Sequence, residues 1–218
     1  MSEIKHTTKI MLPEPTLRRL PWYLAYVEML KNKKIEYVSS TQIAKEINVD
    51  ASQIAKDLSF LNIKGKTRIG YEVSSLMKEL VDFLGFKRKH DAFMIGVGSL
   101  GAALIQDVGL AQYGLNIVAG FDIDKQLTGK SIGNVPIYDI ALLQECQQKY
   151  GVSIAVLAVP VEQSQAAADI VMAGGITAIW NFTPFRIKAP AHIVIQNTSI
   201  YAHLALMYNR MDEQKCNK

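Results

Sequence analysis

A glycine-rich turn is the clearest candidate for chemistry in this sequence. It reads GVGSLG between a strand-like run and a helical run, which is the context that a dinucleotide-binding fingerprint needs. Gly96 would allow a tight turn, Gly98 would let the backbone approach a pyrophosphate, and Gly101 would let helix and strand pack closely. The helix that begins at Ser99 and Leu100 would offer its N–H groups and its positive dipole to phosphates.

A carboxylate follows at the spacing that this fingerprint predicts. Asp122 lies 21 residues past Gly101, in the segment FDID at the end of the next strand-like run. A carboxylate there can bind both ribose hydroxyls and would repel a 2′-phosphate, so the sequence favours NAD(H) over NADP(H). The neighbouring Ile123 and Lys125 complete this part of the predicted site. Two other interpretations are a glycine turn that binds nothing and a CoA-binding version of the same fold.

The acid or base that a dehydrogenase needs is poorly represented. The chain has no Tyr-x-x-x-Lys pair, and His203 is the only one of its four histidines placed where it could face a pocket. A packing or interface role for His203 is the simpler interpretation. No HExxH, GxSxG or P-loop pattern occurs. We therefore predict no catalytic residue and no metal site, and we do not expect an enzyme.

A second group of polar residues indicates DNA binding. Ser39 with Gln42, and Asp50 with Gln53, have the spacing of capping boxes and predict two short helices, through Ile47 and through Leu61, in a helix-turn-helix. The second helix of such a motif enters the major groove. We expect four of its side chains to face the DNA: Ser52, Gln53, Lys56 and Ser59. Among these, Gln53 suits adenine, whereas Lys56 suits guanine or a phosphate.

Basic residues flank this motif on both sides. The segment IKGKTRIGYEV at 63–73 predicts a short basic β-hairpin, the wing of a winged helix, from which Lys64, Lys66 and Arg68 would reach phosphates or the minor groove. Arg18 and Arg19, near the start of the first helix, are further phosphate candidates. Plain solvation is the alternative for each of these basic side chains.

The elements that must position these residues fall into two groups. The apolar spacing predicts helices over 16–30, with a start near Pro21, and over 74–84, ending at Gly85. From residue 92 onward strands and helices alternate, which predicts an α/β fold with a doubly wound, mostly parallel Rossmann-type sheet. The expected strands are 92–95, 117–121, 154–159, 178–180 and 193–195, and the expected helices are 100–113, 140–150 and 163–173. A last helix over 201–211 has no strand left to cover, and we expect it to pack on a partner subunit.

Composition agrees with two soluble modules. The 218 residues are 49% hydrophobic and 20% charged, without an apolar run long enough to span a membrane. Residues 1–90 carry 16 Lys and Arg against 10 Asp and Glu, whereas residues 91–218 carry 8 against 10, so the basic front section suits a polyanion. The start MSEIKHTTK lacks a signal-peptide core, and Cys146 and Cys216 form no disulfide framework. We expect a cytoplasmic protein with a winged-helix domain at 1–85, a Rossmann domain at 86–200 and a dimerisation helix and tail at 201–218.

With both halves described, the chain resembles the Rex family of redox-sensing transcriptional repressors over residues 13–210. In the front half the likeness rests on PEPTLRRLPWYLAYVEML, on VSSTQIAKEINVDASQIAKDLS and on the wing that ends in GY. In the back half it rests on GVGSLG, FDID, GNVPIYDI, LAVPVEQSQ and GGITAIWNFTPFRIKAP.

The resemblance implies a homodimer with a swapped C-terminal helix that binds a double-stranded DNA operator. It implies that NAD⁺ and NADH compete for each Rossmann domain and that NADH releases the DNA. It also implies that the nicotinamide half is lined by two segments, Ala158, Val159 and Pro160, and Asn181, Phe182, Thr183 and Pro184.

The chain departs from the family at several positions. Members of the family carry an arginine in the first helix, a tyrosine after the first Rossmann helix and an aspartate before the last helix, and these residues form a switch contact. The matching positions here are Ala25, Asp107 and Ser199. In the recognition helix Ala55 replaces the usual arginine, and Asn62 replaces the glycine that usually follows that helix. We therefore expect an altered or weak response to NADH and a changed operator.

Two alternatives come from other classes of protein. One is an NAD-dependent oxidoreductase, which the missing acid or base disfavours. The other is a nucleotide- or CoA-binding interaction protein that has lost DNA binding, which the basic wing disfavours.

Overall fold

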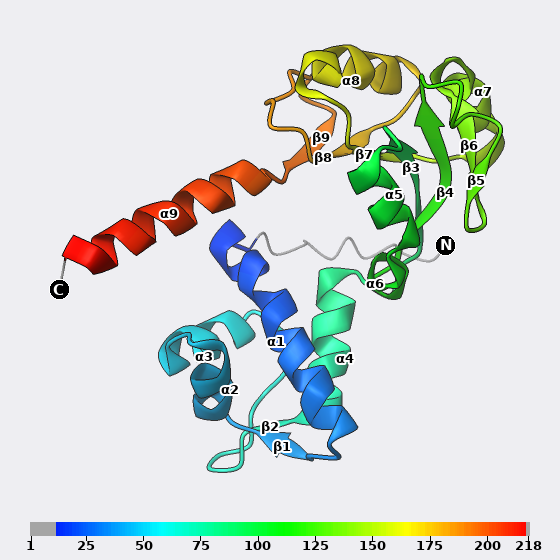
Figure 1. The fold of residues 1–218 in the computed structure, drawn as a ribbon. Coiled ribbons are helices and arrows are strands. Elements are labelled where there is room, and N and C mark those ends of the chain that lie inside the picture. The colour runs from blue at the N-terminus through cyan, green and yellow to red at the C-terminus, as the bar shows by residue number, and fades with distance from the viewer. Residues whose placement is uncertain (1–11, 217–218) are drawn as a thin grey trace, which may run out of the picture. The chain divides into compact units, whose positions relative to one another are not determined.

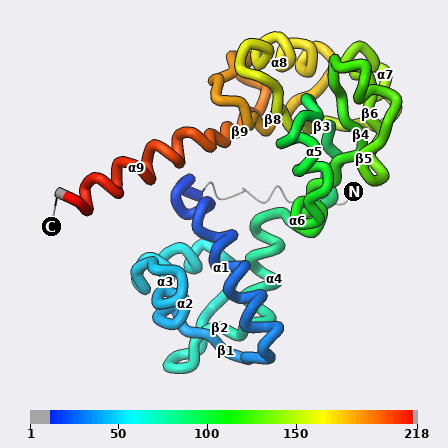
Figure 2. The backbone as a smooth tube through the Cα atoms, viewed as in Figure 1, coloured from blue at the N-terminus to red at the C-terminus, as the bar shows by residue number. Residues whose placement is uncertain are grey.

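The chain forms two compact units, Met1–Lys87 and Arg88–Lys218, in a computed structural model (Figures 1 and 2). The structure describes residues 12–216, and side chains as far as residue 215. The expected absence of a signal core and the side chain of Cys216 concern residues outside that range. The α/β fold that the sequence predicts, with an N-terminal DNA-binding domain and a Rossmann-type sheet, is confirmed.

The first unit is a helical bundle with a two-stranded sheet. Its elements are α1 (Glu14–Asn32), β1 (Tyr37–Val38), α2 (Ser40–Ile47), α3 (Ala51–Leu58), β2 (Tyr71–Glu72) and α4 (Val73–Leu84). Leu20, Leu24 and Val27 of α1 are fully buried against apolar residues of the other helices, such as Ile54 and Leu76. This shared core holds the helix-turn-helix in place.

Helix α1 begins earlier than Pro21 predicted. Pro15 occupies the first turn, where a missing N–H has no cost, and the helix runs on from Glu14 through Pro21. A proline inside a helix removes one backbone hydrogen bond. The helix continues because Leu20, Tyr23 and Leu24, on either side of the proline, are completely buried.

The two predicted capping boxes differ in the structure. At α2 the box is complete, because Ser39 accepts a hydrogen bond from the Gln42 N–H and the Gln42 side chain accepts one from the Ser39 N–H. At α3 the Asp50 carboxylate accepts from the N–H groups of Ser52 and Gln53. The Gln53 side chain does not close this second box, because its amide donates to Asp57 instead.

The predicted basic hairpin forms only in part. One bridge joins Lys66 to Gly70, whereas Tyr71–Glu72 pairs with Tyr37–Val38. Val73, directly after this strand, is buried in the core of the unit and donates its N–H to Glu36. The segment is therefore anchored to the strand that follows α1, and only the tight turn at 66–70 projects as a wing.

The second unit is built on a seven-stranded sheet with the order β5-β6-β4-β3-β7-β8-β9 (Figure 1). All neighbours pair in parallel except β5 with β6, which are antiparallel. The strands are β3 (His90–Ile95), β4 (Leu115–Asp122), β5 (Ser131–Ile132), β6 (Val135–Asp139), β7 (Ile154–Leu157), β8 (Ala178–Asn181) and β9 (Val194–Asn197). The order reverses at β3, which gives a doubly wound sheet a topological switch point beside that strand.

Helices cover both faces of this sheet. Phe93 and Ile95 of β3 pack with the face that α7 (Leu143–Tyr150) and α8 (Ser164–Ala173) cover. Ala92 and Met94 pack with the other face, covered by α5 (Ser99–Gln106) and α6 (Val108–Gln112). This alternation between the faces is what a strand buried on both sides requires.

Two details of this unit differ from the sequence prediction. The single helix expected over 100–113 is broken at Asp107, which is extended and whose carboxylate caps α6 by accepting from the Gly109 N–H at 2.7 Å. Strand β6 was missed because Pro136 interrupts its apolar pattern, yet it pairs with β4 at the Gly120–Ile137 register.

The final helix, α9 (Ile200–Cys216), is exposed along its described length. Several of its large apolar side chains face solvent: Ile200, Tyr201, Leu204, Leu206, Met207, Tyr208 and Met211. Within the described range, none of the helices combines the length and the apolar character that a membrane span needs.

Candidate functional site

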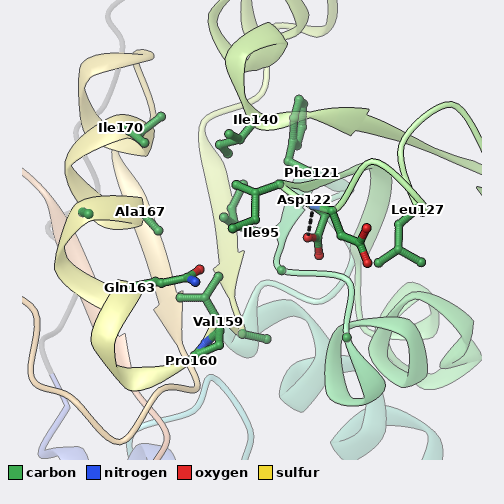
Figure 3. A pocket seen from close by; sticks show the side chains of 16 residues that line it. Ile95, Phe121, Asp122, Leu127, Ile140, Val159, Pro160, Gln163, Ala167 and Ile170 are labelled. Atoms are coloured by element: carbon green, nitrogen blue, oxygen red, sulfur yellow. Dashed lines mark hydrogen bonds between the residues drawn. The ribbon is translucent and has the colours of Figure 1, made fainter.

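A cavity of about 500 Å³ lies at the carboxyl ends of β3, β4 and β7, beside the switch point of the sheet (Figure 3). Its walls come from the glycine turn, from the segment that begins at Phe121, from the segment after β7 and from α8. Ligands of doubly wound folds bind in this crevice. Gly96 and Gly98 of the fingerprint and the predicted Asp122 therefore line the same cavity.

The three glycines of the fingerprint have different reasons to be glycine. Gly96 has φ +85°, and a Cβ there would lie 2.6 Å from the Ala158 carbonyl oxygen. A Cβ at Gly101 would lie 2.0 Å from the Gly96 carbonyl oxygen, so helix and strand need a glycine for close packing. At Gly98 nothing lies within 4 Å of the Cβ position, and its φ of −68° suits any residue. The fold does not require glycine at Gly98, whereas a ligand close to the backbone would.

The start of α5 meets this same open space. Gly98 is its N-cap and provides no side chain to bond the first N–H groups of the helix. The N-terminus of an eight-residue helix with no side-chain cap offers these groups and its dipole to an anion. This arrangement fits the pyrophosphate of a dinucleotide.

Asp122 and Asp124 supply the negative charge of the cavity. Asp122 accepts a hydrogen bond from the Val97 N–H at 2.7 Å and from the Asp124 N–H at 3.0 Å, and these bonds fix the carboxylate at the edge of the cavity. Neither lysine nor arginine is among the lining residues of the described chain. These carboxylate acceptors fit ribose hydroxyls and disfavour a 2′-phosphate.

A second cavity, of about 340 Å³, shares Ala158, Val159 and Pro160 with the first. Its other lining residues are Leu100, Val161, Phe182, Thr183, Pro184, Ile200 and Tyr201. The two cavities thus meet at the segment that the family resemblance assigns to the nicotinamide half. Gly96 and Gly98 line the first cavity and Leu100 lines the second, so the glycine turn and the start of α5 border both.

Other predicted residues lie outside these cavities. Ser99 belongs to the first turn of α5 and Lys125 is exposed, but neither lines a cavity. The Asn181 side chain donates to the Phe185 carbonyl and to Asn197, and accepts from Thr183. This buried amide holds the β8 loop in place.

Sequence reasoning missed one wall of the first cavity. Gln163, Ala167 and Ile170 of the segment after β7 line the cavity on the side opposite Asp122, and Ile140 after β6 lines it close to Phe121 (Figure 3). In the sequence these residues fall within the helices expected over 140–150 and 163–173, and none of them is predicted as a site residue. Only the sheet topology brings them to the same cavity as the carboxylate.

In the first unit, part of the predicted DNA-binding set is free on the surface. Ser52, Lys56 and Ser59 are exposed on one face of α3, and Ala55 is exposed among them. The hydroxyl of Ser59 donates to the Lys56 carbonyl at 2.6 Å. Asn62, just beyond the helix, is also exposed. This face can meet a groove of the duplex.

The wing carries its basic residues in exposed positions as well. Lys64 and Arg68 face solvent, and Arg68 has a left-handed φ of +64° in the 66–70 turn. Lys66 donates to the Tyr37 hydroxyl at 2.9 Å, and this bond raises the pKa of its ammonium group. Lys66 is thereby held against β1, whereas Lys64 and Arg68 remain available to phosphates.

The two arginines of α1 have partners inside the protein. Arg18 pairs with Glu14 at 2.6 Å on the surface. Arg19 forms a two-pronged ion pair with the buried Asp57 of α3, with Nε–Oδ2 at 2.7 Å and Nη2–Oδ1 at 2.9 Å. The predicted adenine reader Gln53 also donates to Asp57, at 2.8 Å.

Asp57 is the most heavily bonded carboxylate in the described chain of this unit. Besides Arg19 and Gln53, it accepts from the Thr16 hydroxyl at 3.0 Å and from the Tyr23 hydroxyl at 2.7 Å. Burial favours the neutral acid, but the hydrogen bonds from these four side chains outweigh it and lower the pKa of Asp57 to about 2. The same cluster raises the pKa of Tyr23, chiefly through burial.

The three residues that replace the switch residues of the family either make local hydrogen bonds or make none. Ala25 is exposed on α1 and has no polar side-chain atom. Asp107 caps α6, and the Ser199 hydroxyl accepts from the Ala202 N–H at 3.1 Å, at the start of α9. Among the described residues, no three histidine, cysteine, aspartate or glutamate side chains gather to hold a metal ion.

Known proteins resemble both units. Residues 11–59 match the family model "Putative DNA-binding protein N-terminus", and residues 87–185 match "CoA binding domain". The redox-sensing transcriptional repressor Rex of Bacteroides fragilis is 57% identical, over 97% of this chain and 96% of its own. That of Treponema denticola is 40% identical, over 89% and 94%.

Solved structures resemble the whole chain. A crystal structure of RSP with beta-NAD⁺ and operator DNA has a TM-score of 0.87 at 30% identity, covering 94% of this chain and 95% of that one. RSP with beta-NADH has a TM-score of 0.85 at the same identity, covering 94% and 97%.

Proposed function

The chain belongs to the Rex family of redox-sensing transcriptional repressors, and from this premise we propose that it binds operator DNA in the cytoplasm under the control of NAD⁺ and NADH. The single observation that carries the coenzyme half is the open space over Gly98, at a helix N-terminus and beside Asp122. The relatives whose structures hold NAD⁺, NADH and operator DNA share the fold over almost the whole length.

In this proposal the two cavities bind one dinucleotide. Gly96, Gly98 and the first turn of α5 would hold the pyrophosphate, and Asp122 the adenosine ribose. The segment Ala158–Pro160 and the loop from Phe182 would line the nicotinamide half. No residue of this chain has to exchange a proton or a hydride with the coenzyme, so the proposal contains no catalytic step.

We further propose that the protein is a homodimer joined through α9. Large apolar side chains on a fully exposed helix are unfavourable in water and mark an interaction surface. A second copy of the chain would cover them. Size-exclusion chromatography with light scattering measures this state directly, and a monomer at micromolar concentration would contradict it.

We also propose that the response of this protein to NADH and NAD⁺ is altered. A ligand shifts an equilibrium only through contacts that differ between the two states. Ala25 has no polar group, and Asp107 and Ser199 are engaged in local caps. NADH and NAD⁺ should therefore change DNA affinity by less than the full switch contact would allow.

The test is a DNA-binding titration with a duplex selected from random sequence. Operator affinity is measured at fixed salt with no nucleotide, NAD⁺, NADH, and CoA as the matched control. We expect salt-dependent binding and a change of less than about 100-fold between NAD⁺ and NADH, equivalent to 2.7 kcal/mol. A larger effect specific to NADH would contradict the altered response, and turnover of an alcohol or hydroxy acid would contradict the proposal as a whole.

The same selection tests the changed recognition helix. Ala55 cannot make the base contact of an arginine, which is worth about 1–3 kcal/mol of discrimination. We expect an operator that differs from the usual family site. Recovery of the unaltered family site would contradict this part of the proposal.

A further inference from the structure

A buried cluster around Asp57 joins α1 to α3. Helix α3 carries the proposed DNA-binding face, which consists of the exposed Ser52, Lys56 and Ser59. Thr16, Arg19 and Tyr23 follow one another at i, i+3 and i+7 on one face of α1. On α3, Gln53 and Asp57 are an i, i+4 pair. All four other members donate to the Asp57 carboxylate, so this single group receives hydrogen bonds from both helices.

The geometry fixes orientation in a way that apolar packing does not. Ile54 and Leu58 of α3 pack in the apolar core with α1, and apolar contacts alone tolerate small rotations and slides. The two-pronged Arg19 pair has a planar, directional geometry, with oxygen–nitrogen distances of 2.7 and 2.9 Å. Tyr23, on the next turn of α1, donates to Oδ2, and Thr16, on the previous turn, donates to Oδ1. The carboxylate therefore sets both the rotation and the register of α3 on α1.

A buried ion pair of this kind is not the most stable way to fill a core. Replacing such pairs with apolar residues of similar volume is often neutral or stabilising, so stability alone does not account for this one. Asp57 has no exposed surface and the Arg19 side chain is only 20% exposed. Asp57 thus accepts five hydrogen bonds, and it lies on the same helix as the exposed Ser52, Lys56 and Ser59.

We propose that Asp57 is the positioning residue of the DNA-binding face and that Gln53 belongs to its cluster and does not read a base. The inference rests on the proposed function, because it concerns how α3 meets an operator. Base and phosphate contacts of α3 are then left to the exposed residues Ser52, Lys56 and Ser59. Arg19, held by the same carboxylate, orients α3 from within.

The first experiment distinguishes a positioning residue from a base reader. Wild type and Gln53→Ala are compared on the selected operator and on a set of duplexes, each with one base pair changed, at 25 °C and fixed salt. A base reader loses discrimination at one base pair when it is removed. We expect Gln53→Ala to weaken binding to every duplex by the same factor, less than about threefold, and to leave the profile of base preference unchanged. Loss of preference at one base pair would overturn the assignment.

Lys56→Ala is the matched control on the same helix, because Lys56 is exposed where Gln53 is held inside. This variant should alter affinity, salt dependence or preference at a base pair under the same conditions. If wild type binds no duplex in a salt-dependent manner, the proposed function fails, and that outcome is distinct from a changed profile in Gln53→Ala.

The second experiment uses Asp57→Asn, which keeps the shape of the side chain and removes the charge that Arg19 requires. Binding is corrected for the folded fraction measured by circular dichroism. We expect at least a tenfold loss of affinity for the operator with less than a twofold change for a random duplex, since phosphate contacts need less exact placement. Wild-type affinity and preference in the folded variant would overturn the positioning role. If Asp57→Asn does not fold, Tyr23→Phe, which removes one hydrogen bond to Asp57 and no charge, should show the same selective loss to a smaller degree, and wild-type preference in that variant would overturn the positioning role.

Discussion

The two functional regions of this molecule treat their polar groups in opposite ways. Around the glycine turn, the backbone is left open: Gly98 faces empty space and no side chain caps α5. In the first unit, by contrast, Arg19 and Gln53 are hydrogen-bonded to Asp57, and Lys66 is hydrogen-bonded to Tyr37. The glycines that predict a ligand site therefore line an open cavity in the second unit. In the first unit, the arginine and glutamine that predict DNA contacts belong to an internal hydrogen-bond network.

The difference reflects what each motif requires. A glycine fingerprint is fixed by backbone geometry, and few other roles demand glycine at the same spacing. Long polar side chains have many possible partners, and a buried carboxylate binds them through the same kind of charge-assisted hydrogen bond as a DNA phosphate. Glycine spacing is thus a more dependable guide to a site than the presence of arginine, glutamine or lysine.

The largest effect is expected from substitutions of two glycines in the fingerprint, Gly101 and Gly98. Gly101→Ala places a Cβ 2.0 Å from the Gly96 carbonyl oxygen, and we expect it to destabilise the second unit by about 3 kcal/mol. Gly98→Ala meets no protein atom within 4 Å, so its melting temperature should fall by only a few degrees. The affinity of Gly98→Ala for NADH should nevertheless fall at least ~30-fold, because the added Cβ would keep the pyrophosphate away from the backbone N–H groups. Hydrogen bonds to a charged group of this kind are worth about 1.5–3 kcal/mol each.

Calorimetry with NADH and thermal unfolding measure both variants. Unchanged NADH affinity in Gly98→Ala would show that the open space over this residue is not a ligand site.

A second test concerns the ionised state of the Asp57 cluster. The pKa of Asp57 is lowered from 3.8 to about 2, so its contribution to stability is present above pH 4 and is lost as the pH falls toward 2. The wild type should lose about 2 kcal/mol more than Asp57→Asn between pH 4.5 and pH 2. Urea unfolding of the first unit, followed at each pH by tryptophan fluorescence, measures the difference, and parallel curves for the two proteins would argue against the cluster.

A smaller effect is expected at the carboxylates of the cavity. Asp122→Asn removes a negative charge beside the ribose, and the preference for NADH over NADPH should shrink about tenfold, which corresponds to about 1.4 kcal/mol. Asp124→Asn should act in the same direction and more weakly. The exposed Glu145→Gln on α7 is the control, and an equal change in that variant would assign the effect to net charge alone.

The smallest effect is expected for a single lysine on the DNA-binding face. Lys56→Ala should reduce the slope of log affinity against log salt by about 1, because one phosphate contact releases about 0.9 counterions. Lys78→Ala, exposed on α4, should leave the slope unchanged. A slope that is the same in wild type and in Lys56→Ala would place the phosphate contacts on the wing residues Lys64 and Arg68.

Prediction succeeded where one residue type has one structural meaning. The capping box of Ser39 and Gln42, the break after α4 at Gly85 and the alternation of strands and helices all form as expected. Prediction was wrong where contacts between distant parts of the chain outweighed the local preference of a residue. Pro21 stays inside α1 because its neighbours are buried, and the wing strand pairs with β1 because Val73 is anchored in the core.

The amino-acid sequence by itself determined the two kinds of unit, the glycine turn with Asp122 after the next strand, and the helix-turn-helix with its basic wing. These follow from periodicity, glycine spacing and capping residues, which act over a few positions of the chain. Only the tertiary structure decided which polar side chains stay free. Arg19 and Asp57 are 38 residues apart, and Gln163 lines the same cavity as Asp122 because β4 and β7 lie on either side of β3. Such pairings depend on how distant elements pack, because the hydrogen-bond partner of a long side chain is set in space and not along the sequence.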